Sequence, residues 1–260
     1  MSRNFELLQK AAEEREQQMA GAAQAAATAA TAMPMEWVEE ADATETGSLP
    51  PAPQGHSREE LTKLVQRLFL LPESPRAVVF SSVERGAGCT WLATQVARAL
   101  ASHGRSRVCL VDANLRHPAV HDVFGMTNHN GLADAVVASA PLQGYLRKSA
   151  VPNLWLLTCG SPEKAEQAMG ASEQMLDCIR QLRTQFDYVI IDAAPMNLYT
   201  DALRMASAAD GIALVLKANS SRREIAQRML QEARNANVRI LGAVLNQRTF
   251  PIPESLYKRL

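Results

Sequence analysis

Six short apolar segments recur after residue 75, and they constrain the fold more than any other feature of the sequence. They are residues 76–82, 107–113, 153–159, 188–194, 211–218 and 239–246. Their nearly continuous Val, Ile and Leu content is typical of strands buried on both faces, and the segments between them have helical composition. Strands that alternate with crossover helices predict an α/β fold with a doubly wound parallel sheet. Ligands of such a fold bind at the carboxyl ends of the strands.

The chain is expected to have three parts: a short N-terminal helix over residues 1–19, a disordered linker over 20–56 and one folded domain over 57–260. Residues 4–18 are rich in charged helix formers, whereas the following stretch of Ala, Thr, Pro and Gly has too few large apolar groups to offset the entropy of ordering. Ser57 is a candidate N-cap for a helix that should pack on the domain or on a neighbouring subunit. The apolar stripe of this helix consists of Leu61, Leu64, Val65, Leu68 and Phe69.

The charge balance and the cysteine pattern narrow the setting and the partners. The chain has 27 basic and 27 acidic side chains, so its net charge gives no reason to expect nucleic acid or an anionic membrane as the main partner. The four cysteines form no C-x-x-C pair and no secretory signal begins the sequence, which favours a reduced cytosolic setting. No apolar stretch approaches the roughly 18 to 20 residues that cross a bilayer.

The segment ERGAGCTW, residues 84–91, has the layout of a phosphate-binding loop between a strand and a helix. Gly86 and Gly88 would let backbone N–H groups close around phosphate oxygens, and the helix N-terminus adds partial positive charge. A standard loop reads G-K-[ST], whereas this chain has Cys89 in the place of the lysine. An ordinary glycine-rich turn is the alternative. The nucleotide-binding residues predicted here are Arg85, Gly86, Ala87, Gly88, Cys89, Thr90 and Trp91.

Two acidic residues stand at the ends of predicted strands. Asp112 lies at the tip of the second predicted strand, and Asp192 follows the apolar run within FDYVIIDAAP. Carboxylates at strand ends beside a phosphate loop can hold Mg²⁺ and orient an attacking group, with the Thr90 hydroxyl as a further ligand. The alternative is that both aspartates only cap the turns that follow them.

Together these motifs resemble the bacterial tyrosine kinase family. Its members are cytoplasmic P-loop proteins that work with transmembrane polysaccharide co-polymerases in making capsule and exopolysaccharide. The resemblance runs from about Ser57 to the C-terminus. Its carriers, besides the loop, are VDANLRHPAVHDVFG (111–125), GLADAV (131–136), FDYVIIDAAPMNLYTDA (186–202), ADGIALVLKA (209–218) and ILGAVLNQ (240–247).

The resemblance implies a P-loop NTPase fold of the deviant-Walker, MinD/ParA-like superfamily, with ATP or ADP and Mg²⁺ as ligands. It places Asp112 on the second Walker aspartate and Asp192 on the Walker B aspartate, both in catalytic and metal-binding roles. Thr90 takes the place of the magnesium-binding hydroxyl. Asn246 falls where related ATPases recognise adenine, and its side-chain amide offers a donor and an acceptor to a base edge.

The chain departs from the family pattern at four places. Cys89 replaces the lysine whose charge approaches the β- and γ-phosphates. Asn114 stands where a second carboxylate is expected, and the oligomerisation motif E-x-x-R-x-x-R reads Glu60, Lys63 and Gln66. The tail has only Tyr257 in place of a tyrosine cluster. Homo-oligomerisation is still implied by the resemblance, but the changed motif weighs against the usual ring.

These departures favour a catalytically impaired regulator that binds nucleotide weakly and acts on the cytoplasmic segment of a membrane co-polymerase. Its expected location is the cytoplasm, held at the inner face of the membrane by that partner. One alternative is an active ATP-dependent tyrosine kinase or ATPase in which Arg85 or a partner's cation replaces the lysine. A second alternative is a partitioning-type positioning ATPase. Cys89 could also be a reactive thiol, because a helix N-terminus lowers a thiol pKa. The preferred interpretation is a small residue that is tolerated in a loop that no longer needs the cation.

Overall fold

The computed structural model describes residues 52–71 and 74–248. Five of the six predicted segments form parallel strands that begin within one residue of the expected position: β1 (Ala77–Ser82), β2 (Val108–Ala113), β5 (Tyr188–Ala193), β6 (Gly211–Lys217) and β7 (Ile240–Asn246). The sixth segment forms the shorter parallel strand β4 (Leu154–Leu157). The sheet order is β3-β4-β2-β5-β1-β6-β7. The predicted helix at residues 1–19, most of the linker and Tyr257 lie outside the described residues.

The two-residue strand β3 (Arg147–Lys148) was not expected from the sequence. It pairs antiparallel with β4 at one edge of the sheet. The sheet is therefore mixed, with parallel strands dominating, and the doubly wound parallel architecture is otherwise confirmed.

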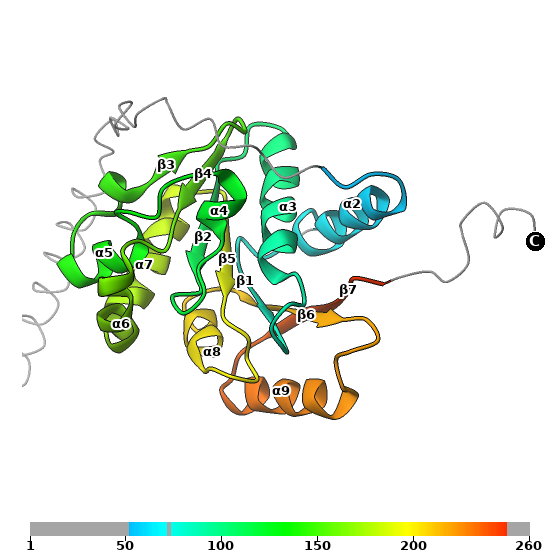
Figure 1. The fold of residues 1–260 in the computed structure, drawn as a ribbon. Helices are drawn as coiled ribbons and strands as arrows, with labels where there is room; N and C mark the ends of the chain where they lie inside the picture. Colours follow the sequence, from blue (N-terminus) through cyan, green and yellow to red (C-terminus); the bar gives the residue numbers. More distant parts are fainter. Residues whose placement is uncertain (1–51, 72–73, 249–260) are drawn as a thin grey trace, which may run out of the picture. The chain divides into compact units, whose positions relative to one another are not determined.

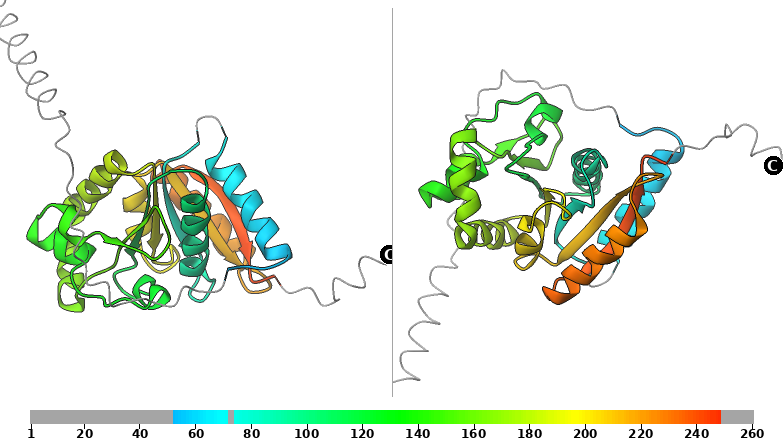
Figure 2. Two further views of the ribbon diagram at one scale, coloured as in Figure 1. Left: turned by 90° about the horizontal axis from the view of Figure 1, so that it is seen from above. Right: turned by 60° about the horizontal axis from the view of Figure 1, so that its bottom comes forward.

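Helices cover both faces of the sheet. They are α2 (His56–Phe69), α3 (Cys89–Ser102), α4 (Val120–Phe124), α5 (Leu132–Ala138), the 3-10 helix η1 (Leu142–Tyr145), α6 (Pro162–Gly170), α7 (Ser172–Gln185), α8 (Asp201–Ala206) and α9 (Arg223–Asn235). Figure 1 shows α2 and α3 on one side of the sheet and α8 and α9 on the other. Both views of Figure 2 agree, with α3 on the side of β6 opposite α9. Right-handed crossovers require this division, because the chain steps in opposite directions along the sheet before and after β4.

Helix α2 begins two residues earlier than expected. Ser57 does not cap it: the N-cap is Gly55, with φ 53°, and no side chain caps the helix. The Gly55 carbonyl accepts hydrogen bonds from the N–H groups of Arg58 and Glu59. The apolar stripe packs as predicted, since Val65 and Phe69 are buried and the three leucines of the stripe pack against the core.

The central strands are buried along their whole length. Every residue of β1 and β2 is buried, as both-face burial in a parallel sheet requires. The register of β2 and β5 sets Asp112 directly beside Asp192, and β1 lies on the other side of β5. Cys109, Cys159 and Cys178 are buried in the core. No helix in the described part of the chain is long and apolar enough to cross a membrane.

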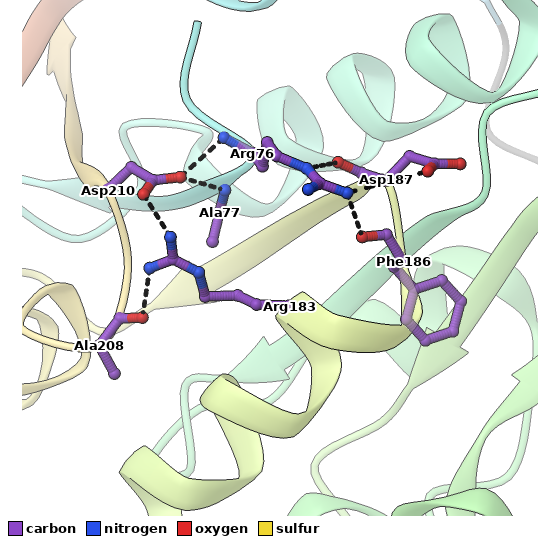
Figure 3. Close-up of polar contacts among 7 residues, drawn as sticks. All are labelled: Arg76, Ala77, Arg183, Phe186, Asp187, Ala208 and Asp210. Atoms are coloured by element: carbon purple, nitrogen blue, oxygen red, sulfur yellow. Dashed lines mark hydrogen bonds and ion pairs between the residues drawn. The ribbon is translucent and has the colours of Figure 1, made fainter. Parts of the chain in front are cut away.

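Polar residues tie together the amino ends of the strands (Figure 3). Asp210, just before β6, accepts hydrogen bonds from the N–H groups of Arg76 and Ala77 at 2.7 and 2.8 Å. Its other oxygen pairs with Arg183 Nη2 at 2.6 Å. Asp187, just before β5, accepts the N–H of Arg107 at 2.7 Å. These acids therefore satisfy backbone donors that the first residues of the strands would otherwise leave unpaired.

Candidate functional site

The loop between β1 and α3 has the backbone that its glycines predict. Gly86 and Gly88 have φ values of 74° and 78°, in the left-handed region that favours glycine. Gly88 is also the N-cap of α3, so the loop leads directly into the helix N-terminus. A Cβ at Gly88 would lie 2.5 Å from Asn246 Nδ2, which leaves no room for a side chain. The loop can therefore present its N–H groups and the positive end of α3 to an anion.

Two amides at the end of β7 hold this loop. Asn246 Nδ2 donates to the Ala87 carbonyl at 2.8 Å, and Gln247 Nε2 donates to the Gly86 carbonyl at 3.0 Å. Asn246 is thus brought to the loop as the sequence predicts, with part of its amide engaged by the loop backbone. Its contact with adenine stays a prediction. Gln247 was not singled out, since it lies beyond the last strand and only tertiary structure brings it to the loop.

Asp112 and Asp192 lie side by side at the carboxyl ends of β2 and β5. Both are buried, at 0% and 1% exposure. Asp112 accepts the N–H groups of Ala119 and Val120, each at 2.9 Å. Burial, together with the negative charge of Asp192, raises the pKa of Asp112 above its usual range, and the backbone bonds only partly oppose this rise. Asp112 therefore caps the turn that follows β2 and also lies beside Asp192 at the end of the sheet that holds the loop.

Asp192 lies against the first turn of α3. The Thr90 hydroxyl donates to Asp192 Oδ2 at 2.5 Å, while Oδ1 is buried and accepts no hydrogen bond from the residues described. Burial raises the pKa of Asp192 as well, although hydrogen bonding to Thr90 and to the Cys89 thiol lowers it in part. The two carboxylates are adjacent and buried, and Asp192 Oδ1 can accept a further contact. A cation bound beside them would favour the ionised form of both carboxylates.

The donor set suits Mg²⁺ in particular. Among the described residues no three His, Cys, Asp or Glu side chains are grouped as an all-protein metal site. Mg²⁺ does not need one, because it is commonly held by one or two carboxylates, a hydroxyl, substrate phosphates and water. Thr90, Asp112 and Asp192 fit that requirement, and their roles as ligands stay predictions.

Cys89 stands at the first position of α3, in the place of the loop lysine. Burial raises the pKa of the Cys89 thiol well above its usual range, and the negative charge of Asp192 adds to the rise. This shift is opposite to the one that a reactive thiol requires, because burial and the adjacent carboxylate oppose the effect of the helix N-terminus. The thiol is a neutral group beside an acid, where a lysine would be a cation.

Arg85 and Trp91 lie at the rim of the loop. Arg85 is exposed, and its Nη2 donates to the Tyr199 hydroxyl at 2.8 Å. The Trp91 side chain is 37% exposed on α3. Neither residue is directed into the acidic pair by any contact, so their nucleotide-binding roles stay predictions. Tyr199 was missed as a site residue, although it lies within the segment 186–202 that carries the family resemblance.

Comparison with known proteins was made by sequence and by structure. No family model matches the chain. The tyrosine-protein kinase CpsD of Streptococcus agalactiae is 28% identical over 173 residues, which cover 66% of this chain and 75% of CpsD. The tyrosine-protein kinase YwqD of Bacillus subtilis (strain 168) is 27% identical over 171 residues, covering 66% of this chain and 72% of YwqD.

Solved structures have the same fold. The chimerical protein CapA2B2 matches with a TM-score of 0.69 and 22% identity, over 79% of this chain and 94% of that one. The kinase domain of Escherichia coli tyrosine kinase ETK matches with a TM-score of 0.64 and 21% identity, over 75% and 78% of the two chains. In sequence and in fold, the chain is therefore similar to bacterial tyrosine kinases.

A septum site-determining protein has the same fold. The protein MinD complexed with Mg-ADP, from Pyrococcus horikoshii OT3, has a TM-score of 0.59 and 22% identity, over 70% of this chain and 76% of MinD. The predicted fold class is therefore confirmed. Compared with a standard phosphate-binding loop, this site differs in one residue type rather than in its arrangement. The loop, the hydroxyl and both acids are assembled, and the loop cation is replaced by a thiol.

Proposed function

We propose that this chain is a catalytically impaired tyrosine kinase-like protein that binds ATP or ADP with Mg²⁺ and regulates a transmembrane polysaccharide co-polymerase in capsule or exopolysaccharide synthesis. One observation carries the proposal: the Cys89 thiol occupies the lysine position and lies beside the buried Asp192. The rest of the site is arranged as nucleotide binding requires. We therefore expect the protein to bind nucleotide but to transfer its phosphoryl group slowly.

The chain's own residues account for binding. The N–H groups of the loop after β1 and the start of α3 attract the phosphates, and Gly88 keeps the loop close to β7. Thr90 and the two strand-end acids are the residues that would hold Mg²⁺, which supplies neutralisation of phosphate charge when bound. Asn246 donates to the loop carbonyl of Ala87 at 2.8 Å, and we assign it to the base.

The missing cation accounts for the impairment. Transfer of a phosphoryl group develops charge that a fixed positive group stabilises, and a neutral thiol provides no such stabilisation. Removing one preorganised stabilising group from an active site typically slows turnover by about 10²–10³-fold. Since the thiol stays protonated, it does not add a second negative charge beside Asp192, so nucleotide binding is weakened less than turnover.

The partner and the cellular setting follow from the family resemblance. We assign the chain to the cytoplasm, at the inner face of the membrane through the cytoplasmic segment of the co-polymerase. A protein that binds nucleotide without efficient turnover can still respond to nucleotide by a change in its affinity for that segment. Self-association belongs to the same proposal, with the altered Glu60, Lys63 and Gln66 motif weakening the usual ring.

The test compares phosphotyrosine formation by the full chain, the Cys89→Lys variant and the Asp192→Ala variant. Each is incubated with ATP, Mg²⁺ and the co-polymerase's cytoplasmic segment, and nucleotide affinity is measured in parallel. We expect nucleotide binding but little phosphotyrosine from the natural chain, and a gain of at least about tenfold from Cys89→Lys. Robust phosphorylation by the natural chain that is abolished by Asp192→Ala would refute impairment.

The active enzyme is a second candidate, favoured by the presence of Arg85 at the rim of the loop. Its guanidinium is held at 2.8 Å from the Tyr199 hydroxyl, on the loop that follows β5. If Arg85 replaces the lysine, then Arg85→Ala removes residual ATP hydrolysis, and Arg85→Lys retains part of it. Hydrolysis unchanged by Arg85→Ala excludes this internal replacement.

A further inference from the structure

Three loops at the carboxyl edge of the sheet meet at the side chain of Tyr199. Arg85, from the loop after β1, donates to the Tyr199 hydroxyl at 2.8 Å. Arg116, from the loop after β2, lies over the Tyr199 ring with Cζ 4.2 Å from the ring centroid. Tyr199 itself comes from the segment between β5 and α8. One tyrosine thus holds two guanidinium groups, by its hydroxyl and by its ring face.

The two arginines differ in how their charge is balanced. Arg116 pairs with Asp201, at 3.4 Å from Nε to Oδ2. Arg85 forms no ion pair with a carboxylate in residues 52–71 and 74–248. Its guanidinium has five N–H donors, and the bond to Tyr199 uses Nη2 alone. The cluster therefore has an uncompensated positive charge with donors to spare.

The position of the cluster along the sheet gives it a direction relative to a bound nucleotide. In the order β2-β5-β1-β6-β7, Asn246 ends β7, whereas Arg116 and Tyr199 follow β2 and β5. Asp112 and Asp192 end these same two strands. A nucleotide with its base near Asn246 and its phosphates in the loop after β1 would therefore extend its last phosphate toward β5 and β2, where the arginines lie.

We propose that Tyr199 is a positioning residue that holds Arg85, beside Arg116, as a cationic pair for the terminal phosphate of a nucleoside triphosphate. This inference rests on the proposed function, because it requires nucleotide in the loop. The pair makes the site selective for the triphosphate over the diphosphate. Arginine suits this role, since its planar fork binds phosphate oxygens in pairs and is always charged.

The test uses Tyr199→Phe, which removes the hydroxyl that holds Arg85 and keeps the ring beneath Arg116. Affinities for ADP and for a non-hydrolysable ATP analogue, both with Mg²⁺, are measured by calorimetry on the full chain. We expect the natural chain to prefer the triphosphate, and Tyr199→Phe to lose about tenfold in triphosphate affinity with ADP affinity within about twofold. The matched control is Tyr145→Phe in η1, which should leave both affinities unchanged.

Arg85→Gln gives a second reading of the same step. It should lower triphosphate affinity at least as much as Tyr199→Phe, and adding Tyr199→Phe to it should produce no further loss, because the hydroxyl acts through Arg85. Equal losses for ADP and triphosphate, or no loss in Tyr199→Phe, would overturn the inference and leave the proposed function standing. A natural chain that binds neither nucleotide would overturn the proposed function itself.

Discussion

The two ends of the parallel sheet carry buried or half-buried aspartates in opposite surroundings. At the amino end, Asp210 has donors on both oxygens, from two backbone N–H groups and from Arg183 (Figure 3). At the carboxyl end, Asp112 and Asp192 lie beside each other, and one oxygen of Asp192 has no donor among the described residues. The first arrangement stabilises the fold. The second costs stability, as expected where an acid is kept for binding a cation or a substrate.

The largest effect should come from breaking the amino end. Asp210→Ala removes the acceptor for Arg76, Ala77 and Arg183, leaving two backbone donors without partners. We expect the free energy of unfolding to fall by about 3 kcal/mol, because hydrogen bonds to charged groups are worth about 1.5–3 kcal/mol each and water replaces part of them. Chemical denaturation measures this loss.

The matched control for Asp210→Ala is Asp177→Ala on α7. The Asp177 side chain is 61% exposed and pairs only with Arg180 one turn away. Its removal should change the free energy of unfolding by no more than about 0.5 kcal/mol. Equal losses in the two variants would contradict the structural role assigned to the amino end.

Asp134 is a buried acid near the carboxyl end of the sheet that, unlike Asp192, has hydrogen-bond or ion-pair partners on both oxygens. It accepts the N–H groups of Gly131 and Ser161, each at 2.9 Å, and pairs with Lys164 at 3.1 Å. Burial alone would raise the pKa of Asp134, but these donors lower it to about 2. The close packing of Gly131 and Gly160 around the carboxylate leaves no room for a Cβ at either glycine.

Asp134→Asn should therefore change how stability depends on pH. A lowered pKa in the folded state gives stability that is present above the unfolded value, near 3.9, and is lost as the pH falls toward 2. We expect a loss of about 2 kcal/mol at pH 7 and a smaller difference from the natural chain at pH 2–3. Urea unfolding at several pH values checks this, and a difference independent of pH would contradict it.

Much of this contrast was accessible from the sequence, and the reasons are physical. Buried parallel strands need nearly continuous apolar residues, so β2 and β5 could be placed, and the acids at their carboxyl ends stand out. The antiparallel strand β3 has two residues and no periodicity, so nothing in the sequence indicates it. Residue type alone favours Ser57 as the N-cap. In the structure Gly55 is the N-cap, because glycine readily adopts the positive φ of 53° found there, and the helix therefore begins earlier.

The chemistry of the site was less accessible where tertiary contacts decide it. A helix N-terminus lowers a thiol pKa, but whether Cys89 also lies beside a buried acid depends on the register of β5 with its neighbours. The contacts of Tyr199 with Arg85 and Arg116 join segments more than eighty residues apart. No spacing rule brings such residues together.

A third test replaces one acid of the crowded pair. Asp192→Asn keeps an oxygen for the Thr90 hydroxyl and removes the negative charge. Because the pKa of Asp192 is raised in the folded state, ionisation costs stability, and this cost is present above the folded pKa and absent at low pH. We expect Asp192→Asn to be more stable than the natural chain at pH 8 by on the order of 1 kcal/mol, with little difference at pH 4.

The same variant should lose Mg²⁺-dependent nucleotide binding, so stability and binding move in opposite directions. Thermal unfolding at both pH values and calorimetry with and without Mg²⁺ measure the two effects. A variant that is less stable at pH 8, or that binds nucleotide with the same dependence on Mg²⁺, would contradict the interpretation that Asp192 is kept for cation binding at a cost in stability.

The two arginines of the amino end differ in their exposure to solvent. Arg183 has a side chain 35% exposed and bonds Asp210 and the Ala208 carbonyl. Arg76 is 61% exposed, and its guanidinium bonds the carbonyls of Asp187 and Phe186. We expect Arg183→Ala to cost about 1.5 kcal/mol and Arg76→Ala about 0.5 kcal/mol, because water compensates the more exposed group.

A double-mutant cycle between Arg183→Ala and Asp210→Ala isolates their pairing, and chemical denaturation supplies all four free energies. The cycle should give a coupling of about 1 kcal/mol, since one short ion pair is shared by the two residues. The equivalent cycle between Arg76→Ala and Asp187→Ala should give nearly zero, because their charged groups are 3.9 Å apart and well exposed. Equal couplings would mean that solvent screens both pairs alike, and the amino end would then owe its stability to the backbone hydrogen bonds of its aspartates alone.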